Sequence, residues 1–184
     1  MHIESIMKTV TLHNKTFEVF IPETEILEIV HSMANQINNQ SAERPLFIAV
    51  LNGSFVFAAD IMRKITIPNA EISFIKLASY QGTKSSGTVN ELIGLNQDLK
   101  GRNVIILEDI IDTGNTLEKI VEIFRTKEVA SLKISTLLYK PDAYKKDIPI
   151  DYIGKSIENK FVVGYGLDYD EIGRNLPHIY KLKE

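Results

Sequence analysis

The chain has 184 residues, 44% of them hydrophobic and 24% charged, values typical of a globular protein with room for one domain. Its formal net charge of −3 argues against broad nucleic-acid binding, which needs a basic face. The absence of cysteine excludes a disulfide framework and a thiolate zinc site, and it fits a cytoplasmic location. The N-terminus lacks signal-peptide features, and the longest apolar runs have the length of strands, so no membrane span is predicted.

Hydrophobic periodicity predicts strands and helices in alternation. In chain order, we expect a hairpin over 10–20, a helix over 26–37, a strand over 46–51, a helix over 55–64, strands over 71–77 and 92–95, a central strand from 104 that ends in acids, a helix beyond 116, strands over 131–139, 151–153 and 161–163, and an edge strand over 179–182. This alternation indicates an α/β fold with a mostly parallel central sheet flanked by helices. No linker or repeat divides the chain, so residues 1–184 are expected to form a single domain.

Residues 104–117, VIILEDIIDTGNTL, are the most informative stretch. A continuous apolar run predicts a buried parallel strand, and it ends in Glu108 and Asp109, with Asp112 close behind. The small polar loop 113–116 then leads into an amphipathic helix, whose first N–H groups and dipole favour an anion such as phosphate. Acids beside an anion cradle suggest a ligand with hydroxyls and phosphate, together with a divalent metal.

Each acid also has a plainer interpretation. Side chains alternate along a strand, so Glu108 and Asp109 point to opposite sides, near the crevice where open α/β sheets bind ligands. An isolated acidic pair is more often a solvated surface feature. Asp112 could simply cap the following helix, although Thr113 and Thr116 could serve equally well.

Two other loops have suggestive compositions. Asn52-Gly53-Ser54 follows one predicted strand directly and precedes a helix, so it is a second candidate anion site. Residues 79–89, SYQGTKSSGTV, are rich in Ser, Thr and Gly. Such a loop is either a lid that closes over an active site or a plain hairpin tip.

Other motifs are missing or incomplete. There is no GxxxxGK[ST] phosphate loop, and Gly164-Tyr165-Gly166 begins a dinucleotide fingerprint that Tyr169 breaks. The four histidines lack ligand spacing, and Ser54 lacks the GxSxG context of a hydrolase nucleophile.

Five stretches, in order, resemble the type I phosphoribosyltransferases, and EDIIDTGNTL resembles their hypoxanthine (hypoxanthine-guanine) branch. Residues 51–55 resemble the pyrophosphate-binding loop, 79–89 the flexible catalytic loop and 104–117 the motif that binds phosphoribosyl diphosphate. Lys140 ends a strand as the base-recognising lysine of the family does, and 160–180 resemble its C-terminal segment. The resemblance implies the type I phosphoribosyltransferase fold, with a small hood built from the N-terminal and C-terminal segments.

For the donor, 5-phosphoribosyl 1-diphosphate, the resemblance assigns roles residue by residue. Glu108 and Asp109 would hold the ribose hydroxyls, directly or through Mg²⁺, and Asp168 would bind the Mg²⁺ that bridges the pyrophosphate. The 5-phosphate would be cradled by Asp112, Thr113, Gly114, Asn115 and Thr116, and the pyrophosphate would be bound by Asn52, Gly53 and Arg174. Asn52 and Asn115 stand where relatives often carry Lys, so we expect weaker or more metal-dependent donor binding.

For the purine, the resemblance assigns Asp112 as the group that exchanges a proton with the five-membered ring, and Ser79 and Tyr80 as lid residues that complete catalysis. Lys140 would donate to the 6-oxo group, Phe161 would stack on the base, and Val162 would offer backbone groups to its edge, with Asp168 beside them. The plainer alternatives are a surface lysine at Lys140, a core residue at Phe161 and a solvated Arg174.

The implied activity is purine salvage. The phosphoribosyl group would pass from 5-phosphoribosyl 1-diphosphate to hypoxanthine, and to guanine, giving IMP or GMP and diphosphate. The family also implies a homodimer or homotetramer. Two alternatives stay open: a transferase for another 6-oxopurine such as xanthine, and a regulator on this fold that senses the donor or a nucleotide.

Overall fold

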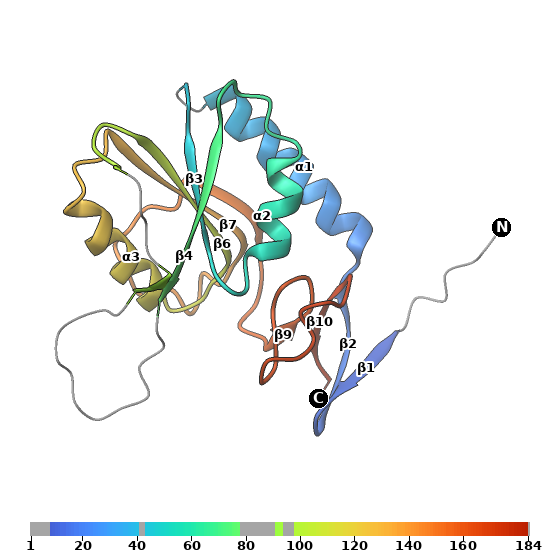
Figure 1. Ribbon diagram of the computed structural model, residues 1–184. Coiled ribbons are helices and arrows are strands. Elements are labelled where there is room, and N and C mark those ends of the chain that lie inside the picture. Colours follow the sequence, from blue (N-terminus) through green and yellow to red (C-terminus); the bar gives the residue numbers. More distant parts are fainter. Residues whose placement is uncertain (1–7, 41–42, 78–90, 94–97, 184) are drawn as a thin grey trace, which may run out of the picture.

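The computed structural model describes residues 8–40, 43–77, 91–93 and 98–183, so the predicted lid at 79–89, with Ser79 and Tyr80, lies outside the described residues. The elements along the chain are β1 (Thr9–Leu12), β2 (Lys15–Ile21), α1 (Glu23–Gln40), β3 (Leu46–Val50), α2 (Phe55–Met62), β4 (Glu71–Leu77), β5 (Glu91–Ile93), β6 (Asn103–Ile111), α3 (Asn115–Arg125), β7 (Ser131–Tyr139), β8 (Tyr152–Ser156), β9 (Val162–Val163) and β10 (Ile179–Leu182). Figure 1 shows a large sheet with helices around it and a smaller sheet beside one end.

The larger sheet has the strand order β5-β4-β3-β6-β7-β8. Every neighbouring pair from β4 to β8 is parallel, and only β5 runs antiparallel to its neighbour β4. The central strands are continuous apolar runs because helices cover both of their faces, and all five residues of β3 are buried. The expected α/β fold with a mostly parallel sheet is confirmed.

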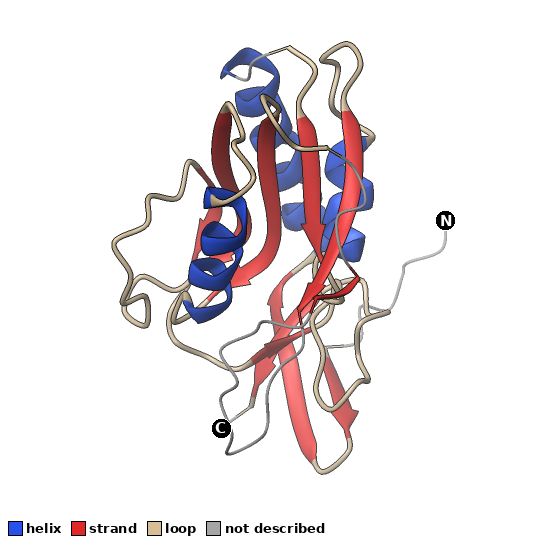
Figure 2. Ribbon diagram, turned by 60° about the vertical axis from the view of Figure 1, so that its left-hand side comes forward, coloured by secondary structure: helices blue, strands red, loops and turns tan. Residues whose placement is uncertain are grey.

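Helices cover the two faces of this sheet unequally (Figure 2). One face packs against α1 and α2, with Phe47 and Leu107 in the same core cluster as Ile26 and Phe57. The other face packs against α3, whose Leu117 and its apolar neighbours join Ile48 and Ile106. Alternate residues of the central strands therefore enter different cores, as the period of two requires. Within the described residues, no helix is both long and apolar enough to cross a membrane.

The smaller sheet has the order β1-β2-β10-β9 and is antiparallel throughout. It brings together strands from the N-terminal and C-terminal segments, which the resemblance assigns to the hood, around a core that includes Phe17, Val163 and Tyr180. One sequence-based expectation is wrong here. The strand at 179–182 was expected at a sheet edge, but β10 lies inside the sheet because β9 pairs with its second side.

The central strand β6 is longer than the sequence suggested. We expected it to end at Glu108 and Asp109, but it continues through Ile110 and Ile111. The extension follows from pairing, since Ile110 and Ile111 lie opposite Leu138 and Tyr139 of β7. The two acids consequently sit inside a strand of the sheet rather than in the loop after it.

Candidate active site

Three adjacent strands deliver the predicted site residues to one edge of the large sheet. Strands β3, β6 and β7 are parallel neighbours, so their carboxyl ends lie together. Residues 52–54 follow β3, residues 112–116 follow β6, and Lys140 follows β7. The sequence-predicted groups of the two anion loops and the base-recognising lysine therefore meet in space.

The two acids of β6 are not a solvated surface pair. Glu108 is buried, with 5% of its surface exposed, and burial followed by the neighbouring charge of Asp109 raises its pKa well above the ordinary value. Burial also raises the pKa of Asp109 to about 6, although the N–H of Ile110 and the positive charge of Arg174 act in the opposite direction. Burial makes the negative charge of these two carboxylates unfavourable, and a bound cation or hydroxyl donors would stabilise that charge.

The acids face different parts of the site. Glu108 lines the pocket beside the loop before α3. Asp109 instead lies against Gly53, where an added Cβ would overlap its Oδ2, and its Oδ1 accepts a hydrogen bond from the N–H of Ile110 at 2.8 Å. A Cβ at Gly166, in the C-terminal segment, would in turn overlap the carbonyl oxygen of Gly53. The first anion loop is thus closely packed between β6 and the C-terminal segment, and any side chain at position 53 would have to displace the carboxylate of Asp109.

The loop at 112–116 has the geometry of an anion cradle. Gly114 is the N-cap of α3, with φ of 84°, and no side chain caps the helix. Among the residues that the structure describes, no side chain caps these N-terminal N–H groups, and the capping role considered for Asp112 is wrong because Gly114 holds the N-cap position. A pocket of about 100 Å³ is lined by Glu108 and by residues 110–117. That volume suits one compact anionic group rather than a whole nucleotide.

Lys140 and Asp112 form a close ion pair. Nζ of Lys140 donates to Oδ2 of Asp112 at 2.7 Å, and Lys140 is 6% exposed, so it is not a surface lysine. The Asp112 side chain is 44% exposed and remains reachable from the crevice. The residues expected to bind the 6-oxo group and to exchange a proton thus occupy neighbouring positions.

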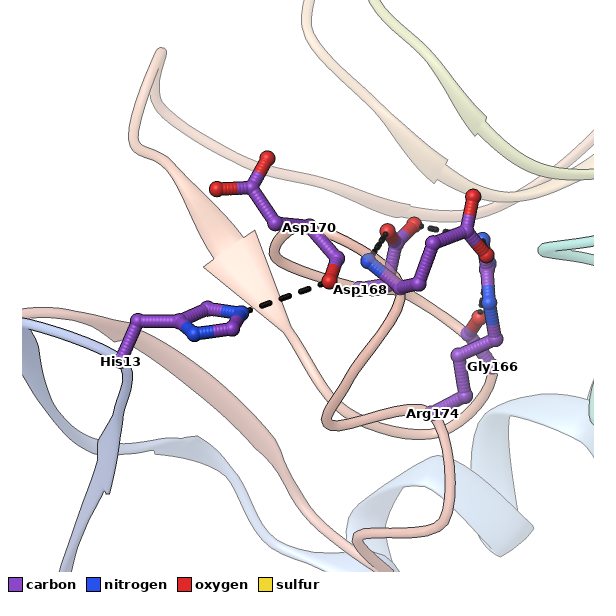
Figure 3. Close-up of polar contacts among 6 residues, drawn as sticks. His13, Gly166, Asp168, Asp170 and Arg174 are labelled. Atoms are coloured by element: carbon purple, nitrogen blue, oxygen red, sulfur yellow. Dashed lines mark hydrogen bonds and ion pairs between the residues drawn. The ribbon is translucent and has the colours of Figure 1, made fainter.

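Asp168 and Arg174 form a second pair in the C-terminal segment (Figure 3). Arg174 Nη2 lies 2.8 Å from Asp168 Oδ1, and its Nη1 donates to the carbonyl oxygen of Gly166 at 2.9 Å. Asp168 Oδ2 also accepts the N–H of Glu171 at 2.8 Å. Both charges act on the pKa of Asp109, Arg174 lowering it and Asp168 raising it, which places this pair at the Asp109 side of the site. Arg174 is therefore not merely solvated.

Phe161 and Val162 lie at the hood. Phe161 is 41% exposed, so the alternative of an ordinary core residue is wrong. Val162 is buried in β9, the edge strand of the hood sheet, where it pairs with Lys181 on one side only. An exposed ring beside a strand edge can offer a stacking surface and backbone groups to a planar base.

The donor chemistry fits a magnesium ion that a substrate shares. Glu108, Asp109 and Asp168 are hard oxygen ligands, and burial raises the pKa of the first two. Among the described residues, no three acidic or other metal-ligating side chains converge into a protein-only cage. Mg²⁺ is commonly held by one or two carboxylates plus substrate phosphates, which is the arrangement these residues allow.

Sequence reasoning missed two groups that support the site. Tyr144 and Lys146, from the loop after β7, pack against Gly114 so closely that a Cβ there would meet both side chains, and Lys146 pairs with Glu118 at 2.6 Å. Lys15 of the N-terminal hairpin lies over the rings of Phe161 and Tyr169. No motif marks these residues, because only the topology brings their segments to the site.

Comparisons with known proteins agree with this geometry. The family described as the phosphoribosyl transferase domain matches residues 22–170. The hypoxanthine phosphoribosyltransferase of Salmonella typhimurium is 41% identical over 171 residues, covering 91% of this chain and 96% of that protein. The hypoxanthine-guanine phosphoribosyltransferase of Streptococcus pneumoniae is 42% identical, covering 94% and 97%. A crystal structure of a hypoxanthine-guanine phosphoribosyltransferase from Bacillus anthracis is similar with a TM-score of 0.82 and 40% identity, covering 91% of this chain and 97% of that one. The chain therefore belongs to the phosphoribosyltransferase family, in the branch of the hypoxanthine and hypoxanthine-guanine phosphoribosyltransferases.

Proposed function

We propose that this protein transfers the phosphoribosyl group of 5-phosphoribosyl 1-diphosphate to hypoxanthine, and to guanine, giving IMP or GMP and diphosphate. The observation that carries the proposal is the contact of Lys140 with Asp112 at 2.7 Å. In a 6-oxopurine, the oxygen O6 and the ring nitrogen N7 lie side by side on one edge and are read together by paired polar groups. A cation and a carboxylate already next to each other match that edge.

Base choice follows from this pair. The Lys140 ammonium donates to O6 of hypoxanthine or guanine, whereas the amino group of adenine cannot accept in the same way. Asp112 accepts the proton that N7 carries. Phe161 supplies a face for stacking, which contributes roughly 1–3 kcal/mol per base. The base must displace the Lys140–Asp112 contact as it binds, so each group exchanges one partner for another.

Donor binding uses the other half of the site. The 5-phosphate takes the pocket lined by residues 110–117, where N–H groups and the helix dipole point at the anion. Glu108 and Asp109 accept from the ribose hydroxyls, and Asn52, Gly53 and Arg174 face the pyrophosphate. Mg²⁺ held by Asp109 and Asp168, together with the donor, would neutralise charge on the departing pyrophosphate.

The transfer balances without a further reactant. Purine N9 attacks the anomeric carbon while the bond between that carbon and the pyrophosphate oxygen breaks. The electron pair of the broken bond leaves with diphosphate. The N7 proton passes to Asp112, so the nucleotide product is neutral in its base. A general base placed in this way typically contributes 10²–10⁴-fold to the rate. Arg174 stabilises the charge that develops on the leaving group.

A spectrophotometric turnover assay tests the proposal. Purified protein, donor and Mg²⁺ would be combined separately with hypoxanthine, guanine, xanthine or adenine, beside the variants Asp112→Asn and Lys140→Met. We expect turnover of hypoxanthine or guanine, a loss of about two orders of magnitude or more in kcat for Asp112→Asn, and a raised base KM for Lys140→Met. Turnover of xanthine alone would refute the base assignment. Donor binding without turnover of any base would favour a sensor built on this fold.

The proposal also covers the domain organisation, the location, the lid and the oligomeric state of the protein. We infer that residues 1–184 act as one domain in the cytoplasm, with 79–89 as the catalytic lid and Ser79 and Tyr80 as its working residues. We also infer a homodimer or homotetramer, which light scattering coupled to size-exclusion chromatography would test.

A further inference from the structure

The ring of Phe161 is held by three neighbours. The ring of Phe17 lies 5.9 Å away, and the ring of Tyr169 lies 5.6 Å away in an edge-to-face arrangement at 86°. The Nζ atom of Lys15 lies 5.5 Å from the centroid of the Phe161 ring. Phe161 nevertheless remains 41% exposed, so these contacts leave part of the residue free for a ligand.

The same hairpin also fixes Tyr169. Lys15 Nζ lies 4.9 Å from the centroid of the Tyr169 ring, and the His13 ring packs against it at 5.3 Å and 85°. The Tyr169 hydroxyl donates to Asn14 Oδ1 at 3.0 Å. One residue further, the His13 Nε2 contacts the Asp170 carbonyl oxygen at 3.3 Å (Figure 3). Three successive hairpin residues therefore contact the stretch 169–170, which directly follows Asp168.

Lys15 directs its charge at these rings rather than at a carboxylate. It is half-buried, and across the described ranges of the chain no acidic side chain pairs with it. Other lysines near the site have acidic partners, such as Lys146 with Glu118 and Lys140 with Asp112. A cation over an aromatic ring is attracted by the ring quadrupole, and the attraction grows as water is excluded.

We propose that Lys15 is a positioning residue for purine binding, acting through Phe161 and Tyr169. The inference rests on the proposed function, because it assumes that the free part of the Phe161 ring stacks on the base. The cation fixes the orientation of the ring before the base arrives and draws π density toward itself, which favours stacking of an electron-rich oxopurine on the remaining surface. Because the ring of Phe161 is already ordered, less conformational entropy is lost when the base binds, and the reacting atoms are unaffected.

The test separates base binding from donor binding and from catalysis. Lys15→Met keeps the length of the side chain but removes its charge. We expect the hypoxanthine KM and the IMP Kd to rise about two- to five-fold, the range of a partly exposed cation–π contact. The donor KM and kcat should stay within about twofold of wild type, because within the described ranges the ammonium group of Lys15 lies over the rings of Phe161 and Tyr169 and not against donor-binding or reacting groups. Lys15→Arg should restore the wild-type base KM, since guanidinium also stacks on aromatic rings.

Lys181→Met is a matched control. Lys181 belongs to the same sheet and lies over the ring of Phe20, with Nζ 5.4 Å from its centroid, but not over Phe161. Because Lys181 Nζ also lies 3.7 Å from Glu18 Oε1, its loss should lower the unfolding temperature at least as much as Lys15→Met does while leaving the base KM unchanged. An equal rise of the base KM in both variants would show a general effect of hood stability and overturn the inference.

A double-mutant cycle with Phe161→Leu decides the route of the effect. If Lys15 acts through the ring, Lys15→Met has no further effect on base KM or IMP Kd in the Phe161→Leu background. A full effect that persists there would overturn the inference, as would an unchanged base KM in Lys15→Met alone. Either result alongside normal wild-type turnover leaves the proposed function intact. A wild-type protein that neither turns over a 6-oxopurine nor binds IMP would overturn the proposed function, and the inference with it.

Discussion

Neutralising Asp109 should make the protein more stable while it removes activity. The folded-state pKa of Asp109, about 6, exceeds its ordinary value of 3.8, so the folded state binds more protons than the unfolded state between these pH values. Stability therefore falls as pH rises through this window, and the full penalty applies above about pH 6. At 1.36 kcal/mol per pKa unit the difference corresponds to about 3 kcal/mol, an upper bound because the unfolded and folded chains both relax. Asp109→Asn keeps an oxygen for the N–H of Ile110 and removes this penalty.

The assay is urea denaturation at several pH values between 4 and 8, with chelator present and no donor. We expect Asp109→Asn to be about 1–3 kcal/mol more stable than wild type at pH 7.5 and nearly equal near pH 4. Asp142→Asn, which changes an exposed carboxylate, is the control and should show no such difference. Mg²⁺ plus donor should stabilise wild type more than Asp109→Asn. The reasoning fails if the variant is less stable than wild type at pH 7.5.

Four further substitutions probe the rest of the site. Gly53→Ala places a Cβ where Asp109 Oδ2 now lies. We expect thermal denaturation to show a destabilisation of about 1–3 kcal/mol, and kcat/KM to fall at least about tenfold. Unchanged kinetics would show that the loop at residue 53 is not constrained. Arg174→Lys replaces the two nitrogens that hold the carbonyl of Gly166 and Asp168 with a single ammonium group. Loss of a charge-assisted bond worth about 1.5–3 kcal/mol should raise the donor KM at least about tenfold in a steady-state assay, and an unaltered donor KM would contradict this. Asn115→Lys and Asn52→Lys each add a positive charge beside a proposed phosphate position. Calorimetry should find the affinity for the donor unchanged or improved by up to about fivefold. A large loss of affinity would mean that the replaced asparagine has a role of its own.

Much of the fold was readable from the sequence because local patterns and tertiary packing agree. The strands 71–77 and 131–139 have the predicted bounds, and the apolar runs of β3 and β6 are buried as their composition requires. Boundaries failed where pairing with a neighbour decided them. Strand β6 continues past its acids because β7 extends alongside, and β10 is interior because β9 closes the sheet.

The site was readable only in part. The motif 104–117 contains its own local structure, so a strand, an anion loop and a helix could be predicted together. The contact between Lys140 and Asp112 depends on two strands meeting, and spacing along the chain does not encode it. The roles of Lys15 and Tyr144 depend on distant segments that pack onto Phe161 and Gly114, and neither residue lies in a recognisable motif.

The position of β10 has a consequence for synthesis on the ribosome. The elements around the phosphate pocket, from β3 through β7, are all made before residue 140, but β10 must insert between β2 and β9 before Phe161 is set against its neighbours. A nascent chain that has emerged only through β8 contains every strand of the large sheet, but it still lacks Val162, Tyr165 and Ile179, which belong to the core beneath α1 and α2, and β2 still lacks its partner β10. The phosphate pocket is thus translated before the pair Asp168 and Arg174 and before the exposed ring of Phe161.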